Sequence, residues 1–161
     1  MDVHLAIASK RDVREYASTP IPDDVVQRIL DAGRLAGSSA NKQQREFVIV
    51  SDRETLAQAV YVPQNILGAA LVIAIAGKAG GLDMGRAAQN MMLAAWNDGV
   101  VSCPNGQRDR EAVERLVGAP VGAVLTFGYP ARPRDPESRT AAEWSARANR
   151  KPLTELVREV D

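Results

Sequence analysis

Apolar and polar residues follow two different periods along the chain, and these periods predict its helices and strands. Apolar residues recur with helical spacing before Gly37, whereas residues 69–76 form a continuous apolar run. Such a run is typical of a central strand covered on both faces. The predicted helices span residues 2–9, about 20–37, 52–60, 83–98, 108–117 and 152–160, and the predicted strands span 47–51, 69–76 and 121–129, with a short extended piece at 100–102.

These elements predict one domain in which helices alternate with three or four strands. The alternation fits an α/β fold, or an α+β fold with a mixed sheet. A chain of 161 residues can form a single domain with a real core. Residues 10–16 read as a charged turn or short strand. Residues 131–150 are rich in Pro and Arg and are predicted to be an extended arm or excursion. The chain is then one domain, 1–161, with residues 131–161 as its C-terminal arm or excursion.

A polar loop lies between the second predicted helix and the first predicted strand. Its side chains offer many hydrogen-bond donors and acceptors between two rigid elements, where binding sites often lie. An ordinary helix end at Gly37 followed by a turn is the alternative interpretation. The polar residues of the loop are Ser38, Ser39, Asn41, Gln43 and Gln44.

Composition excludes several classes of protein. Twenty basic and twenty acidic residues balance, so the net charge does not favour nucleic acid or a membrane surface as a partner. One cysteine, Cys103, cannot form an intrachain disulfide, and with a single histidine it cannot build a structural zinc site. The first residues do not resemble a signal peptide, and the apolar run 66–77 is too short to span a bilayer. We therefore expect a cytoplasmic protein without a metal.

Basic residues gather near the two ends of the chain. A solvated surface explains most such clusters, but two clusters that converge on one anion are the sharper hypothesis. The first cluster holds Lys10, Arg11 and Arg14, and the second holds Arg132, Arg134, Arg139, Arg147, Arg150 and Lys151.

The side chains of the sequence do not form a recognisable catalytic site by themselves. The only histidine is His4, so a Ser–His–Asp triad cannot be built. Cys103 precedes Pro104 and has no evident base, which argues against a nucleophile. The glycine-rich loop 77–81 matches neither the dinucleotide nor the P-loop pattern. An enzyme built from this chain would need a cofactor to supply its reaction.

Several segments, in order and in register, make the chain resemble the FMN-dependent nitroreductase family. The resemblance covers nearly the whole chain. The segments are Lys10–Tyr16, Pro20–Pro22, Ile29–Gly33, Ser38–Gln43, Phe47–Val50, Asp83–Ala95, Gly99–Ser102, Thr126–Pro130 and Arg150–Leu153.

The resemblance implies an α+β fold with a mixed sheet flanked by helices, an intertwined homodimer, and one FMN at each of two interface sites. NAD(P)H would reduce the flavin, which would then reduce a nitroaromatic, quinone or similar acceptor by a ping-pong mechanism, without a catalytic side chain. The implied phosphate contacts are Lys10, Arg11, Arg14, Arg150 and Lys151. The implied ring contacts are Ser38, Ser39, Asn41 and Gln43 from the opposite subunit, Asn65 or Gln64, and the backbone around Val101 and Ser102.

Departures from the family pattern leave other functions open. Asp12 replaces a more common serine in the cofactor segment, and we expect it to pair with Arg11 or Arg14. Gln44–Arg45 and Pro104–Gly106 replace aromatic segments, and the region 52–82 is short. The alternatives are a non-catalytic FMN-binding or storage dimer, a flavin-fragmenting or deazaflavin-using relative, and a structural domain without a cofactor.

Overall fold

The computed structural model describes residues 1–160, which divide into two compact units. The larger unit runs from Arg11 to Arg134, and the smaller joins residues 1–10 to the chain from Asp135 onward. Within residues 1–160, the helices are all too short or too polar to cross a lipid bilayer.

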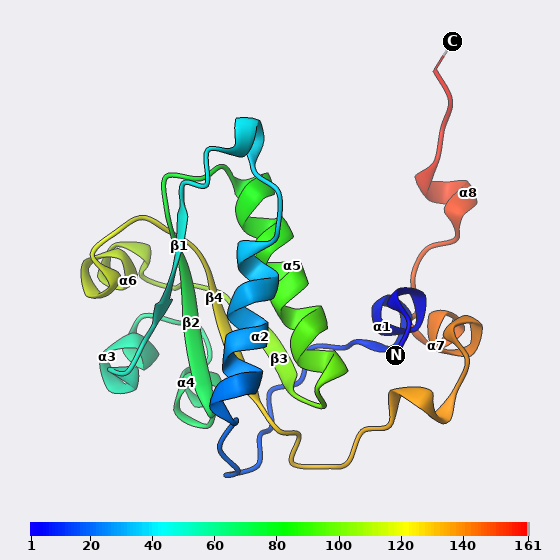
Figure 1. Ribbon diagram of the computed structural model, residues 1–161, viewed down its shortest axis with the longest axis horizontal. Coiled ribbons are helices and arrows are strands. Elements are labelled where there is room, and N and C mark those ends of the chain that lie inside the picture. Colours follow the sequence, from blue (N-terminus) through cyan, green and yellow to red (C-terminus); the bar gives the residue numbers. More distant parts are fainter. Residues whose placement is uncertain (161) are drawn as a thin grey trace. The chain divides into compact units, whose positions relative to one another are not determined.

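A four-stranded sheet in the order β1-β2-β4-β3 forms the centre of the larger unit (Figure 1). Neighbouring strands all pair antiparallel. A parallel bridge from Asp12 to Ser102 adds the N-terminal segment beside β3, where the Val13 amide donates to the Ser102 carbonyl at 3.1 Å. The strands are β1 (Arg45–Ile49), β2 (Leu71–Gly77), β3 (Val101–Asn105) and β4 (Val121–Gly128).

Helices α2 (Asp23–Arg34) and α5 (Gly81–Asn97) pack on one face of the sheet. Ile29, Met91 and Phe127 are completely buried there. Gly33 permits this packing, because a Cβ at this position would lie 2.7 Å from the Phe47 ring. The long predicted helix at 83–98 is confirmed within two residues at each end.

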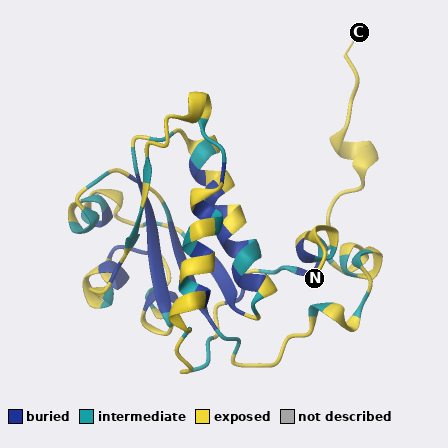
Figure 2. Ribbon diagram, viewed as in Figure 1, coloured by how far each residue is buried: buried dark blue, intermediate teal, exposed yellow. Residues whose placement is uncertain are grey.

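Three shorter helices cover the opposite face of the sheet: α3 (Arg53–Gln58), α4 (Pro63–Leu67) and α6 (Arg110–Val117). Leu56, Ile66 and Val113 are completely buried beneath them. Because helices cover both faces, the central strands β2 and β4 are buried almost throughout (Figure 2). This confirms the prediction of a central strand at 69–76 and the α+β fold class.

Helix α2 ends three residues earlier than predicted. It stops at Arg34 rather than near Gly37, and Leu35 is its C-cap residue. The Arg45 side chain explains the early end, because its guanidinium donates to the carbonyls of Gly33, Arg34 and Ala36. A cation at this position also complements the negative end of the helix dipole. Gly37 instead leaves room for Arg86: a Cβ there would lie 2.5 Å from its Nη2.

The smaller unit contains more helix than the sequence predicts. It holds α1 (Val3–Ser9), a 3₁₀ turn (Pro136–Ser138), α7 (Ala141–Arg147) and α8 (Leu153–Leu156). The extended conformation predicted for 131–150 is wrong at α7, where Thr140 and Glu143 form a capping box that starts the helix. Helix α8 ends at Leu156 rather than at 160, since its side chains are exposed and a short unpacked helix is marginal.

Candidate functional site

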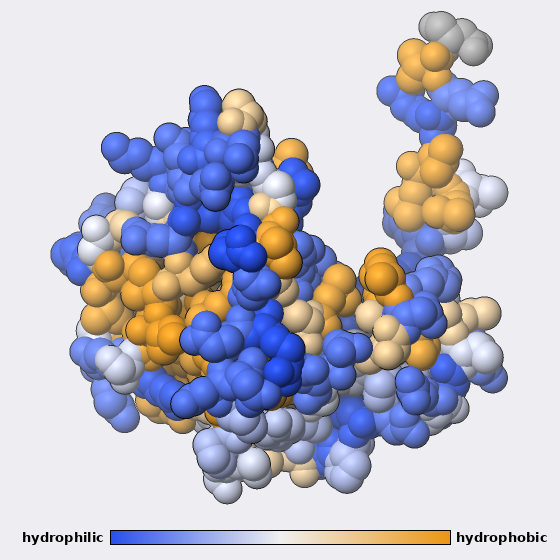
Figure 3. Space-filling view, viewed as in Figure 1, coloured by the Kyte–Doolittle hydropathy of each residue, from blue (hydrophilic) through white to orange (hydrophobic). Residues whose placement is uncertain are grey.

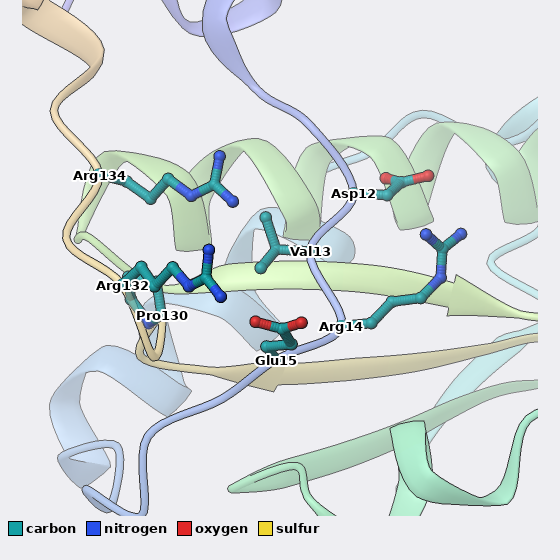
Figure 4. A pocket seen from close by; sticks show the side chains of 7 residues that line it. All are labelled: Asp12, Val13, Arg14, Glu15, Pro130, Arg132 and Arg134. Atoms are coloured by element: carbon teal, nitrogen blue, oxygen red, sulfur yellow. The ribbon is translucent and has the colours of Figure 1, made fainter.

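A pocket of about 380 Å³ lies where the segment after α1 meets the chain that leaves β4 (Figure 4). Two backbone contacts hold the segments together: the bridge from Tyr16 to Pro130, and a 3.2 Å hydrogen bond from the Ala131 amide to the Glu15 carbonyl. The pocket is lined by Asp12, Val13, Arg14, Glu15, Pro130, Arg132 and Arg134.

Three guanidinium groups and two carboxylates face this pocket, so its lining carries a net charge of about +1 at neutral pH. Within residues 1–160, Arg14, Arg132 and Arg134 form no salt bridge or hydrogen bond through their side chains. Figure 4 shows Arg132 and Arg134 extending toward the buried Val13, while Arg14 lies beside Asp12. The structure thus brings one residue of the first basic cluster together with two of the second.

Beside the pocket, a buried hydroxyl on β3 lacks a partner. Ser102 is 1% exposed, and its Oγ has no hydrogen-bond partner among residues 1–160. Ser102 pairs with Phe127 of β4, which places its side chain on the sheet face covered by α2 and α5. A buried polar group without a partner costs about 1–3 kcal/mol, so this hydroxyl fits a position for a ligand. Val101, the other predicted backbone contact on β3, is also buried.

The opposite face of β3 carries a network of hydrogen-bonded polar side chains. The Asn65 amide donates to Asn105 Oδ1 at 3.0 Å, and the Asn105 amide donates to Thr126 Oγ1 at 3.1 Å. Thr126 Oγ1 donates to the Cys103 carbonyl at 3.1 Å and lies 2.8 Å from Tyr16 Oη. Burial raises the pKa of Tyr16 to about 12, so the phenol keeps its proton and donates to Thr126.

Asn65 is one of the predicted ring contacts, and the network shows where it lies. It is 5% exposed on α4, and one of its amide hydrogens is used inside the protein by Asn105. Ser102 and Asn65 therefore lie on opposite faces of the sheet. Gln64, the alternative, is exposed on the same helix.

The predicted amide loop is held in an unusual conformation at the C-terminal end of α2. Ala40, Asn41 and Gln43 have positive φ angles of 48°, 52° and 51°, a region that side chains other than glycine rarely adopt. Two hydrogen bonds fix the loop: Gln43 N to Ser38 Oγ at 3.0 Å, and Ser39 N to Asp83 Oδ2 at 3.1 Å. Strain of this kind concentrates at binding sites.

Within one chain, this loop and the arginine pocket are not brought together. The loop follows the C-terminal end of α2, whereas the segment after α1 leads to the opposite end of that helix (Figure 1). Twelve helical residues separate the two ends, which corresponds to about 18 Å. If the loop takes part in the same site, it must come from a second copy of the chain.

The remaining predicted phosphate contacts are Lys10, Arg11, Arg150 and Lys151. Arg11 follows α1 at the start of the larger unit, and Lys10 ends α1 in the smaller unit, where its amide donates to the Ala6 carbonyl. Arg150 Nη1 donates to the Ala148 carbonyl at 3.3 Å, and Lys151 Nζ lies 3.8 Å from Glu155 Oε2. Both of the last two side chains are exposed in the smaller unit.

Sequence reasoning did not name several residues that shape the site. Arg132 and Arg134 were visible only as part of a basic cluster. Tyr16 and Thr126 lie in segments that resemble the family but, like Asn105, were given no role, because their contacts join positions as far as 110 residues apart.

Comparison with known proteins identifies the family. The sequence profile described as "Nitroreductase family" matches residues 7–79 and 77–129, and the chain therefore belongs to the nitroreductase family. A relative from Archaeoglobus fulgidus, named "Putative NADH dehydrogenase/NAD(P)H nitroreductase", is 32% identical over 149 residues, which cover 80% of this chain and 86% of the relative.

Solved structures agree with this assignment. An NADPH:FMN oxidoreductase from Vibrio harveyi, complexed with NAD+, is 26% identical with a TM-score of 0.74, covering 80% of this chain and 71% of that one. A structure from Desulfovibrio desulfuricans, in complex with FMN, has a TM-score of 0.81 and covers 100% of this chain and 98% of that one. At 23% identity the second match supports the fold alone. Membership of the nitroreductase family makes the chain an oxidoreductase.

Proposed function

We propose that the chain is an FMN-dependent NAD(P)H oxidoreductase that reduces nitroaromatic, quinone or similar acceptors. The observation that carries the proposal is the buried Ser102 hydroxyl on β3, which has no hydrogen-bond partner among residues 1–160. The segment that holds Asp12 and Arg14 is bridged to this strand at Ser102. Family membership supports the reaction class. The Vibrio harveyi relative, an NADPH:FMN oxidoreductase, supports the cofactor and the electron donor.

The residues present fit a phosphorylated flavin. A phosphate group carries about two negative charges near neutral pH, and the pocket beside Arg14 has a positive net charge. Amide and hydroxyl groups can bind the carbonyls and nitrogens of the ring edge, and Ser102 offers such a hydroxyl. Arg11 and Arg14 would hold the phosphate side, and Val101 and Ser102 would face the ring.

FMN would supply the redox chemistry, by accepting a hydride from NAD(P)H and, after the nicotinamide has left, reducing the acceptor in the same place. The chain's own residues would bind and orient the ring. Positive groups and amide donors near the ring would favour the additional negative charge of the reduced cofactor through charge-assisted hydrogen bonds.

We also propose that the active form is a homodimer in which Ser38, Ser39, Asn41 and Gln43 serve the site of the partner. The distance between this loop and the pocket within one chain supports the proposal. A hollow of about 560 Å³ beside the loop is lined by Leu35 and Leu82, whose side chains are 66% and 77% exposed. Apolar side chains this exposed favour contact with another protein surface.

The C-terminal tail supports the same proposal. Its apolar side chains lie uncovered in the space-filling view (Figure 3). Leu153 is 75% exposed and Val160 is 77% exposed. A segment that presents apolar side chains without covering them within its own unit is suited to packing on a second copy. The buried, unbridged Cys103 fits a reducing compartment, and we propose the cytoplasm.

The purified protein tests the function directly. We expect a yellow dimer whose flavin absorbance is bleached by NADH or NADPH without oxygen and restored by a quinone or nitroaromatic compound. Light scattering checks the mass, and absorbance spectra check the cofactor. A colourless monomer that does not bind added FMN would contradict the proposal. Tight FMN binding without turnover of any acceptor would favour an FMN-storing dimer.

A further inference from the structure

Arg132 and Arg134 line the charged pocket from the segment that follows β4. They flank Pro133, whose ring fixes its own backbone φ angle and restricts the residue before it to extended conformations. The segment is also held by the hydrogen bond from the Ala131 amide to the Glu15 carbonyl at 3.2 Å. The backbone of this segment therefore holds the Cα atoms of both arginines beside the pocket, while their side chains still have to become ordered on binding.

The side chains of the two arginines have no partner in the part of the chain that the structure describes. Within residues 1–160 neither forms a salt bridge or hydrogen bond through its guanidinium group. Other exposed arginines of the same unit do so: Arg28 binds Asp98 at 2.7 Å, and Arg110 binds Glu114 at 2.8 Å. Glu15 also lines the pocket, and its carboxylate has no salt bridge or hydrogen bond among residues 1–160. The pocket thus keeps its guanidinium groups available for an anion.

The size and chemistry of the pocket indicate which anion it suits. Its volume of about 380 Å³ lies within the range of small-molecule sites and exceeds that of a simple inorganic ion. Guanidinium groups bind phosphate oxygens in a bidentate manner, through charge-assisted hydrogen bonds. A phosphate monoester keeps three such oxygens and about two charges, whereas a diester keeps less of both.

We infer that Arg132 and Arg134 bind the phosphate monoester of a nucleotide-type ligand in this pocket. The inference rests on the proposed function, which brings two such groups to the protein: the 5′-phosphate of FMN and the 2′-phosphate of NADPH. It adds Arg132 and Arg134 to Arg11 and Arg14 of the same unit as proposed phosphate contacts.

Matched ligand pairs test the inference, because each pair differs by one phosphate monoester. The double variant Arg132→Gln with Arg134→Gln should weaken binding of FMN relative to riboflavin, or raise the KM for NADPH relative to NADH, by at least about tenfold. The pair that responds identifies the source of the phosphate. The unphosphorylated member should change by less than about twofold, since it makes no contact with these groups.

A variant that is expected to strengthen binding separates loss of a contact from misfolding. Glu15→Gln removes a negative charge from the pocket lining and should strengthen binding of the same phosphorylated ligand severalfold. Arg115→Gln on α6 is the matched control, because it removes an exposed arginine that does not line the pocket and should leave both ratios unchanged.

Two outcomes would overturn the inference: unchanged binding of both members of each pair in the double variant, or equal weakening of both members of each pair. A direct phosphate measurement separates this failure from failure of the proposed function. If the wild-type protein binds no flavin, ³¹P NMR titration with inorganic phosphate should still show binding that the double variant loses. Phosphate binding that persists in the double variant would contradict the inference.

Discussion

Strands β2 and β3 both pair with β4, yet they bury very different side chains. β2 is apolar on both faces, with Ile73 and Ile75 toward α2 and α5 and with Val72 toward the shorter helices. β3 instead buries Ser102 and carries Asn105. On one face of β3 Asn105 binds other side chains, and on the other face the buried Ser102 Oγ has no hydrogen-bond partner among residues 1–160. This difference separates a strand that stabilises the fold from one that, as we propose, also contributes to a ligand site.

The largest effect should come from β2. Ile73→Ala removes a completely buried side chain and leaves a cavity, so the free energy of unfolding should fall by about 2–5 kcal/mol in urea denaturation. Ile49→Ala is the matched control, because Ile49 pairs directly with Ile73 but is 53% exposed on β1. We expect the control to lose less than about 1 kcal/mol. Equal losses would contradict the description of β2 as the core strand.

The face of β3 that carries the hydrogen-bond network around Thr126 should show the next largest loss of stability on mutation. Thr126→Val keeps the shape of the side chain but removes the acceptor used by Tyr16 and Asn105 and the donor to the Cys103 carbonyl. We expect the free energy of unfolding to fall by about 1–3 kcal/mol, since buried polar groups lose their partners. Chemical denaturation measures the change. A neutral result would show that the network contributes nothing to stability.

Tyr16 makes this network sensitive to alkaline pH. Its pKa is about 12 in the folded protein and about 10 in an unfolded chain, so the folded state holds the phenol proton more tightly. The contribution of this pKa difference to the free energy of unfolding is fully present below pH 10 and is lost as the pH rises from 10 to 12. Tyr16→Phe should remove this pH dependence and cost about 1 kcal/mol at neutral pH.

Denaturation across this pH range compares Tyr16→Phe with Tyr61→Phe. Tyr61 is 69% exposed, so its variant should retain the wild-type pH dependence. The same alkaline loss in both variants would show that another group is responsible.

The face of β3 that carries Ser102 should show the smallest effect on stability. Ser102→Ala removes a buried hydroxyl that has no partner among residues 1–160, so the free energy of unfolding of the protein without flavin should stay within about 0.5 kcal/mol or rise slightly. FMN binding, measured by fluorescence titration, should nevertheless weaken severalfold. A loss of stability like that of Thr126→Val, with unchanged FMN binding, would show that both faces of β3 are structural.

Local pattern was sufficient to predict much of the fold. The strands near β2 and β4 and the helix α5 follow from apolar runs and helical spacing, and these elements are confirmed within a few residues. Errors arose where a distant side chain decides the outcome. Helix α2 ends early because Arg45, which lies beyond the loop, binds its last carbonyls. Helix α7 was missed because a capping box outweighs the Pro- and Arg-rich composition around it.

The site could be predicted only in part. The motif at residues 10–16 and the amide loop were named from sequence, and their roles toward FMN stay predictions. That Arg14 shares a pocket with Arg132 and Arg134 depends on the pairing of Tyr16 with Pro130, which joins residues 114 apart in sequence (130 minus 16). Sequence reasoning could group the arginines into clusters but could not choose which of them meet.

The sequence by itself determined the family, most of the helices of the larger unit and the two central strands, because hydrophobic spacing and local motifs are encoded by neighbouring residues. The tertiary structure alone decided the order of the strands, the network around Thr126, the unpaired Ser102 and the composition of the arginine pocket. Each of these depends on contacts between residues far apart in the chain. Such contacts are selected by the packing of the whole unit, which a local pattern does not contain.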